Sequence, residues 1–190
     1  MIILYGGSFN PPTLAHYEIS KYLIEKYNPQ EFIFIPVGNV YDKNALVDFK
    51  HRYQMLKIIA NKLPKTIVSD YESQKEYQGT IATLDYFQDQ YPTESLYYVI
   101  GADNLLTIKT WIDYERLISL YKFIVFNRDN INSAHFIKTQ IPKNYQSAFI
   151  QENTFPNLAI SSSLYRNEKK ANIVLKEIND YIYKHHLYMR

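Results

Sequence analysis

Cysteine is absent from this 190-residue sequence, so disulfide bonds and thiolate metal sites are excluded. Long hydrophobic runs are absent as well, because proline, glycine or charge interrupts every candidate, and no membrane span is expected. The first residues, MIILYGGSF, have no basic segment before their apolar run and do not resemble a signal peptide. We therefore expect a cytoplasmic protein without a membrane partner, folded as one globular domain over residues 1–190.

Glycine is scarce, with five residues in the chain, and their spacing excludes two common nucleotide-binding motifs. The sequence contains no G-x-x-x-x-G-K-[ST] phosphate loop and no G-x-G-x-x-G fingerprint. Kinases and ATPases of the phosphate-loop type, and the common dinucleotide-binding dehydrogenases, are therefore disfavoured.

Net charge is small, because 21 basic residues face 19 acidic residues and leave a formal charge of +2. This balance gives no reason to expect a nucleic-acid partner. Four histidines lack the spacing of metal ligands and are interpreted as surface or helix-end residues: His51, His135, His185 and His186. We expect no metal ion held by protein side chains.

Strand-like and helix-like segments alternate along the chain. Short runs rich in β-branched and aromatic residues predict strands at Ile2–Tyr5, Phe32–Val37, Thr66–Ser69, Leu96–Ile100 and Phe123–Phe126. Apolar residues at helical spacing predict helices at Leu14–Tyr27, His51–Leu63, Thr80–Gln90, Tyr114–Tyr121 and Ile173–His186. The alternation predicts an α/β fold, with a parallel sheet flanked by helices and a small C-terminal helical portion. The irregular, polar segment Asn127–Phe155 is expected to be a long loop or a partly mobile excursion.

The first predicted strand runs into Gly6–His16, GGSFNPPTLAH. Glycines let the backbone approach a ligand closely, and successive amides can cradle phosphate. Thr13 can cap the following helix, and His16 lies about one turn further along the same face. From the residues alone, a phosphate-binding turn and an ordinary strand-to-helix turn are about equally supported.

A second polar cluster lies at Ile160–Arg166, ISSSLYR. Three serines before a helix offer hydroxyl caps and backbone amides. Arg166 falls about one turn in, on the side of Ser162 and Ser163, so the group could receive an anion. Taken alone, this segment fits a plain capping sequence with a surface arginine better.

Together the two segments resemble the signatures of the nucleotidyltransferase superfamily. GGSFNPPTLAH resembles its (T/H)-x-x-H signature, and ISSSLYR resembles its I-S-S-T-x-x-R signature. Other segments resemble the nicotinate- or nicotinamide-mononucleotide adenylyltransferases, in that family's order: IPVGNVYDKNAL, YQGTIATL, IGADNLLTIKTW and YIYKHHLY. The resemblance covers essentially the whole chain. It departs from the usual pattern at Ala15, where glycine is frequent, and mildly at Ser163 and Tyr165.

The resemblance implies a Rossmann-like fold and transfer of AMP from ATP to a mononucleotide, with Mg²⁺ bound mainly by the phosphates and water. Alignment and charge stabilisation would carry the catalysis, because a phosphate is already a nucleophile near neutral pH. The implied catalytic residues are His16, Lys43 and Arg166. The implied ATP-binding residues are Gly7, Ser8, Phe9, Thr13, His16, Gly101, Asp103, Ile160, Ser161, Ser162, Ser163 and Arg166. The implied mononucleotide-binding residues are Ser8, Phe9, Asn10, Lys43, Thr80, Thr83 and Trp111.

Several alternatives stay open. The small single-domain build resembles bacterial enzymes that prefer nicotinate mononucleotide, so that acceptor is expected, with nicotinamide mononucleotide as the alternative. Another adenylyltransferase of the superfamily, such as one acting on phosphopantetheine, is the nearest rival enzyme. A catalytically silent nucleotide-binding protein is the rival from another class. The sequence leaves the oligomeric state open, and a homo-oligomer is one alternative.

Overall fold

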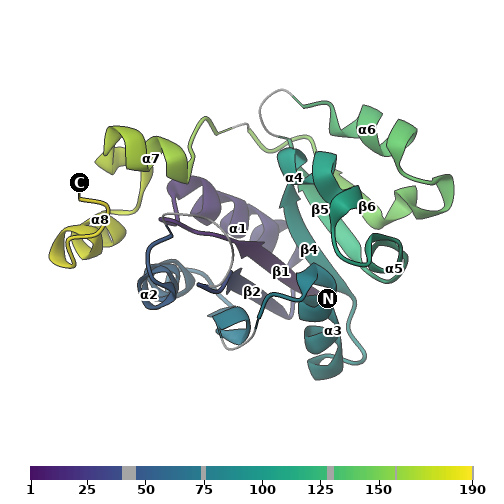
Figure 1. The fold of residues 1–190 in the computed structure, drawn as a ribbon, viewed down its shortest axis with the longest axis horizontal. Helices are drawn as coiled ribbons and strands as arrows, with labels where there is room; N and C mark the ends of the chain where they lie inside the picture. Colours follow the sequence, from purple (N-terminus) through teal and green to yellow (C-terminus); the bar gives the residue numbers. More distant parts are fainter. Residues whose placement is uncertain (40–45, 74–75, 128–130, 157, 190) are drawn as a thin grey trace. The chain divides into compact units, whose positions relative to one another are not determined.

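A computed structural model describes residues 1–39, 46–73, 76–127, 131–156 and 158–189. It contains a six-stranded parallel sheet with the order β3-β2-β1-β4-β5-β6, and helices alternate with the strands along the chain (Figure 1). This is the strand order of Rossmann folds, in which ligands bind beyond the carboxyl ends of the strands. The predicted fold class is therefore confirmed. In the part of the chain that the structure describes, no helix is both long and apolar enough to cross a membrane.

The chain divides into two compact units, and each is described by itself. Unit 1 comprises Met1–Gly6 and Tyr77–Asn157. Its strands are parallel neighbours, with β4 between β1 and β5 and with β6 on the other side of β5. Its elements are β1 (Ile2–Gly7, whose last residue belongs to unit 2), α3 (Gly79–Gln90), β4 (Leu96–Gly101), α4 (Ala102–Thr107), η2 (Ile108–Thr110), α5 (Tyr114–Leu120), β5 (Lys122–Phe126), α6 (Ser133–Gln140), η3 (Lys143–Ala148) and β6 (Phe149–Glu152).

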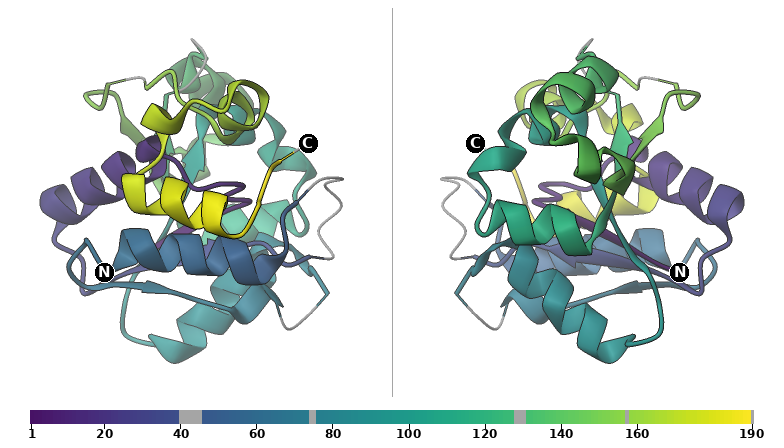
Figure 2. Two further views of the ribbon diagram at one scale, coloured as in Figure 1. Left: turned by 90° about the vertical axis from the view of Figure 1, so that its left-hand side faces the viewer. Right: turned by 90° about the vertical axis from the view of Figure 1, so that its right-hand side faces the viewer.

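Unit 2 comprises Gly7–Glu76 and Leu158–Arg190. The last helix of the chain runs beside α2, as Figure 2 shows. Just after α2, Nζ of Lys62 lies 2.6 Å from Oε1 of Glu177 on this last helix. The C-terminal helices therefore pack onto a helix that follows the second strand. The elements of unit 2 are α1 (Leu14–Tyr27), β2 (Glu31–Pro36), α2 (Phe49–Ala60), β3 (Thr66–Val68), η1 (Tyr71–Ser73), α7 (Ser162–Glu168), η4 (Ala171–Ile173) and α8 (Lys176–Lys184).

The core strands are apolar on both faces. In unit 2 the four residues Phe32–Ile35 of β2 are fully buried, and in unit 1 the same holds for Phe123–Val125 of β5. Continuous β-branched and aromatic runs suit strands of a parallel sheet, which helices cover on both sides. These runs explain why five of the strands could be predicted from the sequence.

One prediction was wrong. The segment Asn127–Phe155, expected to be a long loop, contains α6, η3 and strand β6. β6 escaped notice because it has only four residues, FIQE, and lies at the edge of the sheet, where it pairs with β5 alone. An edge strand needs no continuous apolar run, since one side of it has no neighbouring strand. The last predicted helix is also shorter than expected, because a 3₁₀ turn precedes α8.

Candidate active site

The loop after β1 is held by a buried aromatic side chain. Phe9 is 2% exposed, and its ring meets the rings of His16 and Phe34 edge-on, with centroids 5.0 and 5.6 Å away. Its φ of 46° lies in the left-handed region, which is strained for an aromatic residue and persists only where the surroundings impose it. The peptide bond between Asn10 and Pro11 is cis. Because the ring of Phe9 is buried, only its backbone could contact a ligand.

Thr13 and His16 form a reciprocal cap at the start of α1. The backbone N–H of Thr13 donates to Nδ1 of His16 at 2.9 Å, and the Thr13 hydroxyl lies 2.9 Å from the same nitrogen. The arrangement is a capping box in which histidine takes the place of the usual Glu or Gln. A ring nitrogen that accepts from a backbone N–H carries no proton, so the neutral imidazole carries its proton on Nε2. The spacing of the first signature thus fixes which nitrogen of His16 can donate.

The second signature packs directly against this loop, 151 or more residues away in sequence. The hydroxyl of Ser162 donates to the carbonyl of Pro11 at 2.8 Å, and Nη1 of Arg166 donates to the carbonyl of Asn10 at 2.6 Å. Nη2 of Arg166 donates to Ser163 Oγ at 3.0 Å. Unit 2 therefore brings together the two segments that sequence reasoning treated separately.

Ser161 is the residue that begins this second segment structurally. It is the N-cap of α7, and its hydroxyl accepts from the backbone N–H of Leu164 at 3.1 Å. Ser162 and Ser163 lie in the first turn of the helix, and Ile160 precedes the cap. The capping interpretation is correct for Ser161, whereas Ser162 joins α7 to the loop after β1.

Arg52 is a residue of this region that the sequence analysis missed. Its guanidinium is fully buried on α2, and it donates to the carbonyls of Val47 at 2.7 Å and Ser8 at 3.0 Å. Burial lowers the pKa of Arg52 despite the nearby Tyr188, Asp48 and Glu72. A signal was present, because position 52 shares a helix face with three buried apolar residues three, four and seven positions later.

Three of the implied mononucleotide-binding residues, Thr80, Thr83 and Trp111, lie in unit 1. Gly6 lies against Tyr98, and a Cβ at position 6 would clash with the Tyr98 hydroxyl unless that side chain shifted. The Tyr98 ring in turn meets Trp111 edge-on, with centroids 6.5 Å apart. Trp111 is only partly buried. The start of the first motif and the single tryptophan are thus linked through one tyrosine.

Thr80 and Thr83 lie on the first turns of α3, where their residues are 5% and 2% exposed. This helix begins at Gly79, which has a φ of 89°. A Cβ at Gly79 would lie 2.8 Å from Cβ of Ile112, the neighbour of Trp111. The threonine-bearing helix start and the tryptophan segment are therefore in direct contact.

Gly101 and Asp103 lie at the start of α4. Gly101 is its N-cap, and Asp103 is the second residue of the helix, with an exposed side chain. Lys43, the third implied catalytic residue, lies outside the described residues.

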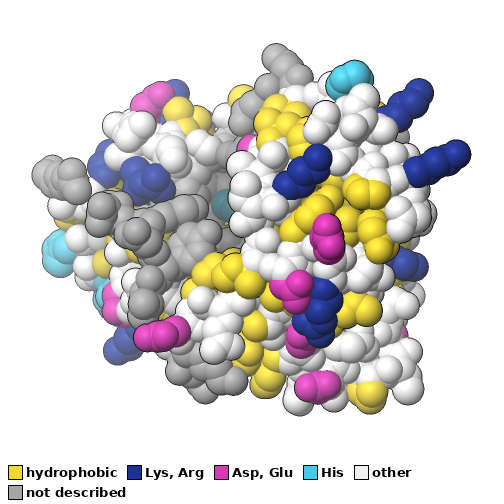
Figure 3. Space-filling model, turned by 45° about the vertical axis from the view of Figure 1, so that its right-hand side comes forward, with side chains coloured by type: hydrophobic (Ala, Val, Ile, Leu, Met, Phe, Trp, Pro, Cys, Tyr) yellow, Lys and Arg dark blue, Asp and Glu magenta, His cyan; other side chains and the backbone are white. Residues whose placement is uncertain are grey.

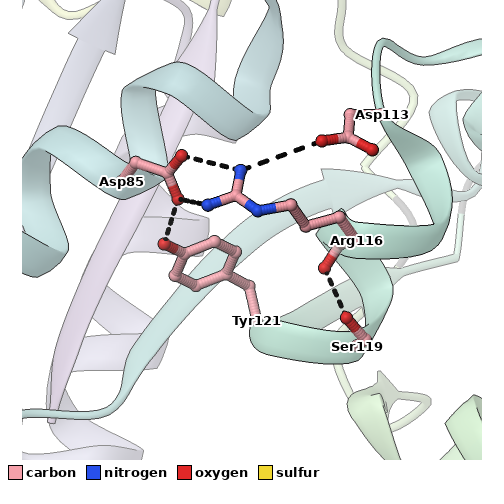
Figure 4. Close-up of polar contacts among 5 residues, drawn as sticks. All are labelled: Asp85, Asp113, Arg116, Ser119 and Tyr121. Atoms are coloured by element: carbon pink, nitrogen blue, oxygen red, sulfur yellow. Dashed lines mark hydrogen bonds and ion pairs between the residues drawn. The ribbon is translucent and has the colours of Figure 1, made fainter.

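A polar clamp joins α3 to the end of α5 (Figure 4). The guanidinium of Arg116 donates to both oxygens of Asp85 at 2.8 and 3.1 Å, and the Tyr121 hydroxyl donates to the same carboxylate at 2.7 Å. Burial acts to raise the pKa of Asp85, but these hydrogen bonds outweigh it and hold the pKa below its usual value. Burial together with the bond to Asp85 raises the pKa of Tyr121. The clamp fixes α5, which follows the Trp111 segment, against the helix that carries Thr80 and Thr83.

The chain resembles known proteins over its whole length. A family model described as cytidylyltransferase-like matches residues 4–168. A probable nicotinate-nucleotide adenylyltransferase from Acholeplasma laidlawii (strain PG-8A) is 34% identical, over 99% of this chain and 97% of its own. This chain belongs to the nicotinate-nucleotide adenylyltransferase family. A relative with the same description from Campylobacter jejuni subsp. jejuni (serotype O:6) is 32% identical, over 97% of this chain and 96% of its own.

A solved structure agrees with this assignment. Nicotinic acid mononucleotide adenylyltransferase from Plasmodium falciparum, in complex with NaAD, has a TM-score of 0.78 at 26% identity and covers 98% of this chain and 96% of its own. In the present chain, the two signature segments are hydrogen-bonded to each other within unit 2.

Proposed function

We propose that this chain transfers AMP from ATP to nicotinate mononucleotide, releasing pyrophosphate and forming deamido-NAD, a step of NAD biosynthesis. The observation that carries the proposal is the contact of the two signatures, in which Arg166 of α7 binds the loop that presents His16. Relatives and a solved structure with this described activity support it. The proposal treats residues 1–190 as one functional nucleotidyltransferase.

In the proposed reaction, a phosphate oxygen of the mononucleotide attacks the α-phosphorus of ATP, and the bond from that phosphorus to the pyrophosphate oxygen breaks. The nucleophile needs no general base, so the chain contributes alignment and charge stabilisation. We assign to Nε2–H of His16 a hydrogen bond to the α-phosphate, because Nδ1 is occupied by the Thr13 backbone. The guanidinium of Arg166 has five N–H donors in a planar fork, so Arg166 would bind the β- and γ-phosphates while it keeps its contact to Asn10.

The remaining ATP contacts are proposed for backbone and side-chain groups of both units. In unit 2, Gly7 ends β1, Ser8 and the backbone of Phe9 follow it, and Ile160 with the three serines precedes Arg166. In unit 1, Gly101 ends β4, and the carboxylate of Asp103 in α4 could accept from a ribose hydroxyl. Mg²⁺ is proposed to enter as a complex with ATP, with phosphate oxygens and water as its main ligands. Among the described residues, no group of three or more His, Asp or Glu side chains could hold a metal ion.

For the acceptor, we propose that Trp111 stacks on the pyridine ring and that backbone groups near Thr80 and Thr83 read its substituent. Stacking would treat nicotinate and nicotinamide alike, because their rings are the same. A carboxylate accepts hydrogen bonds only, so amide donors at the substituent would select nicotinate. Lys43, Ser8 and Asn10 are proposed to contact the mononucleotide phosphate. Cytoplasmic location and a homo-oligomeric state stay predictions.

The experiment that tests this function is a pyrophosphate-release assay with ATP, Mg²⁺ and a panel of acceptors. Nicotinate mononucleotide should give the fastest release, nicotinamide mononucleotide a slower one, and phosphopantetheine none above background. Pyrophosphate release with phosphopantetheine as the only active acceptor would assign the chain to another branch of the superfamily. Nucleotide binding without release under any condition would establish a catalytically silent protein.

A further inference from the structure

The last residues of the chain fold back toward the loop after β1. α8 ends at Lys184, and both His186 and Tyr188 then adopt left-handed φ values, 52° and 60°. The backbone N–H of Leu187 returns to the carbonyl of Ile182 at 3.0 Å. Left-handed φ values are costly for residues other than glycine, so contacts made by the tail must hold this path.

One of those contacts reaches Asn10, which is 3% exposed. The hydroxyl of Tyr188 lies 2.8 Å from Oδ1 of Asn10, and the backbone N–H of Val47 lies 3.1 Å from the same oxygen. A backbone N–H can only donate, so the atom between them is the amide oxygen. The Tyr188 hydroxyl must therefore donate to it. Burial raises the pKa of Tyr188, which keeps the hydroxyl protonated and able to donate even beside Arg52 and Arg166.

We propose that Tyr188 is a positioning residue for adenylyl transfer, which acts through Asn10 to hold the loop between β1 and α1. The inference rests on the function proposed above and extends it to the C-terminal tail. One end of Asn10 is fixed by Tyr188 and Val47, while its carbonyl receives the guanidinium of Arg166. Three residues later the chain reaches Thr13, whose N–H sets the orientation of His16. Loss of the Tyr188 hydroxyl therefore loosens the common support of Arg166 and His16.

The test compares two variants that each lose one tyrosine hydroxyl. Tyr188→Phe removes the donor to Asn10. The matched control is Tyr165→Phe, because the Tyr165 hydroxyl is bonded to Asn179 of α8 at 3.3 Å and the ring of Tyr165 contacts that of Tyr188. We expect Tyr188→Phe to lower kcat about fivefold to tenfold, as the loss of one intramolecular hydrogen bond allows, with both KM values within about twofold. Tyr165→Phe should keep kcat within about twofold.

A double-mutant cycle asks whether the effect passes through Asn10. In an Asn10→Ala background, Tyr188→Phe should lower kcat by less than about twofold, because the acceptor is already gone. Equal losses of kcat in Tyr188→Phe and Tyr165→Phe would overturn the inference. So would a Tyr188→Phe effect that is as large in the Asn10→Ala background as in the wild type.

Hydrogen exchange supplies a readout that needs no substrate. Amides of the Gly7–His16 segment should exchange faster in Tyr188→Phe than in Tyr165→Phe or the wild type. If all three proteins exchange this segment at the same rate, the tail does not position the loop and the inference is wrong. A wild-type protein that releases no pyrophosphate would instead contradict the proposed function, and the exchange comparison would still decide the role of Tyr188.

Discussion

At the residue scale, single side chains in unit 2 have unambiguous hydrogen-bonding roles. Nδ1 of His16 is occupied by the Thr13 backbone, so Nε2 is the nitrogen that can donate. Arg52 is fully buried and binds two backbone carbonyls, one in the loop after β1 and one just before α2. The first side chain is proposed to act on the substrate, and the second shapes the loops around it, so their removal should have different consequences.

Replacing His16 should affect turnover far more than folding. His16→Ala removes the proposed donor to the α-phosphate, and loss of one such donor typically costs about 2.7–4 kcal/mol, or about 100- to 1,000-fold in kcat. His135→Ala, at an exposed position of α6, serves as the control and should keep full activity. Steady-state kinetics checks this, and near-normal turnover of a folded His16→Ala protein would remove His16 from the mechanism.

Replacing Arg52 should affect folding first. Arg52→Met leaves the carbonyls of Ser8 and Val47 without their buried donor, which should lower the free energy of unfolding by about 2–4 kcal/mol. Lys57→Met changes an exposed residue of the same helix and should stay within about 0.5 kcal/mol of the wild type. Urea denaturation measures both. Equal midpoints for the two variants would show that the buried guanidinium contributes no net stability.

At the element scale, two contacts in unit 1 join α3 to the part of the chain that runs from Trp111 to Tyr121. One is the contact of Gly79 with Ile112, and the other is the clamp of Asp85 with Arg116 and Tyr121. Figure 3 shows one face of the molecule, on which hydrophobic side chains are interspersed with basic and acidic ones. The two contacts together fix the helix start proposed to read the acceptor against the tryptophan proposed to stack on it.

A methyl group at Gly79 should disturb both folding and acceptor binding. Gly79→Ala places a Cβ 2.8 Å from Ile112 Cβ at a φ of 89°, which should destabilise the fold by more than about 1 kcal/mol. We expect a higher KM for the mononucleotide and little change in the KM for ATP. Ile112→Gly in the same protein should restore part of the loss, because it removes the Cβ with which the added methyl group clashes. If both KM values rise together, the helix start has no specific role in acceptor binding.

The clamp of Asp85 with Arg116 and Tyr121 predicts that the folded state loses stability in acid. The pKa of Asp85 is lower in the folded state than its usual 3.8, so the clamp's stabilisation is complete above that value and is lost as pH falls through the lowered pKa. Asp85→Asn should therefore reduce the loss of melting temperature in that acidic range and leave the curve near neutral pH parallel to that of the wild type. Melting curves from about pH 6 to 2 test this. Parallel curves throughout would show that Asp85 contributes nothing to acid sensitivity.

At the scale of the whole molecule, the sequence predicts elements better than the contacts between them. The continuous apolar runs of β2 and β5 and the periodic apolar face of α1 are local signals, and their elements lie where expected. β6 and α6 could not be predicted, because a short edge strand and a polar helix depend on partners far along the chain. The hydrogen bond of Tyr188 to Asn10 joins residues 178 positions apart, and no local sequence pattern predicts such a contact.

In the candidate site too, the motifs could be predicted from the sequence, whereas the contacts between them could not. Both signatures were visible as motifs, and the residue pair Thr13 and His16 already had the spacing of a capping box. The contacts of Ser162 and Arg166 with the loop after β1 arise only when α7 packs against it. Tertiary packing, and not local propensity, therefore decides how the two signatures combine.

One measurement tests the central claim most directly. A single reaction contains ATP, Mg²⁺ and equal concentrations of nicotinate and nicotinamide mononucleotides, and mass spectrometry quantifies deamido-NAD and NAD as they form. Because donors at the substituent should favour a carboxylate, the account predicts at least about tenfold more deamido-NAD at early times. Pyrophosphate should accumulate in a one-to-one ratio with total dinucleotide. An excess of NAD, or pyrophosphate without either dinucleotide, would contradict the account.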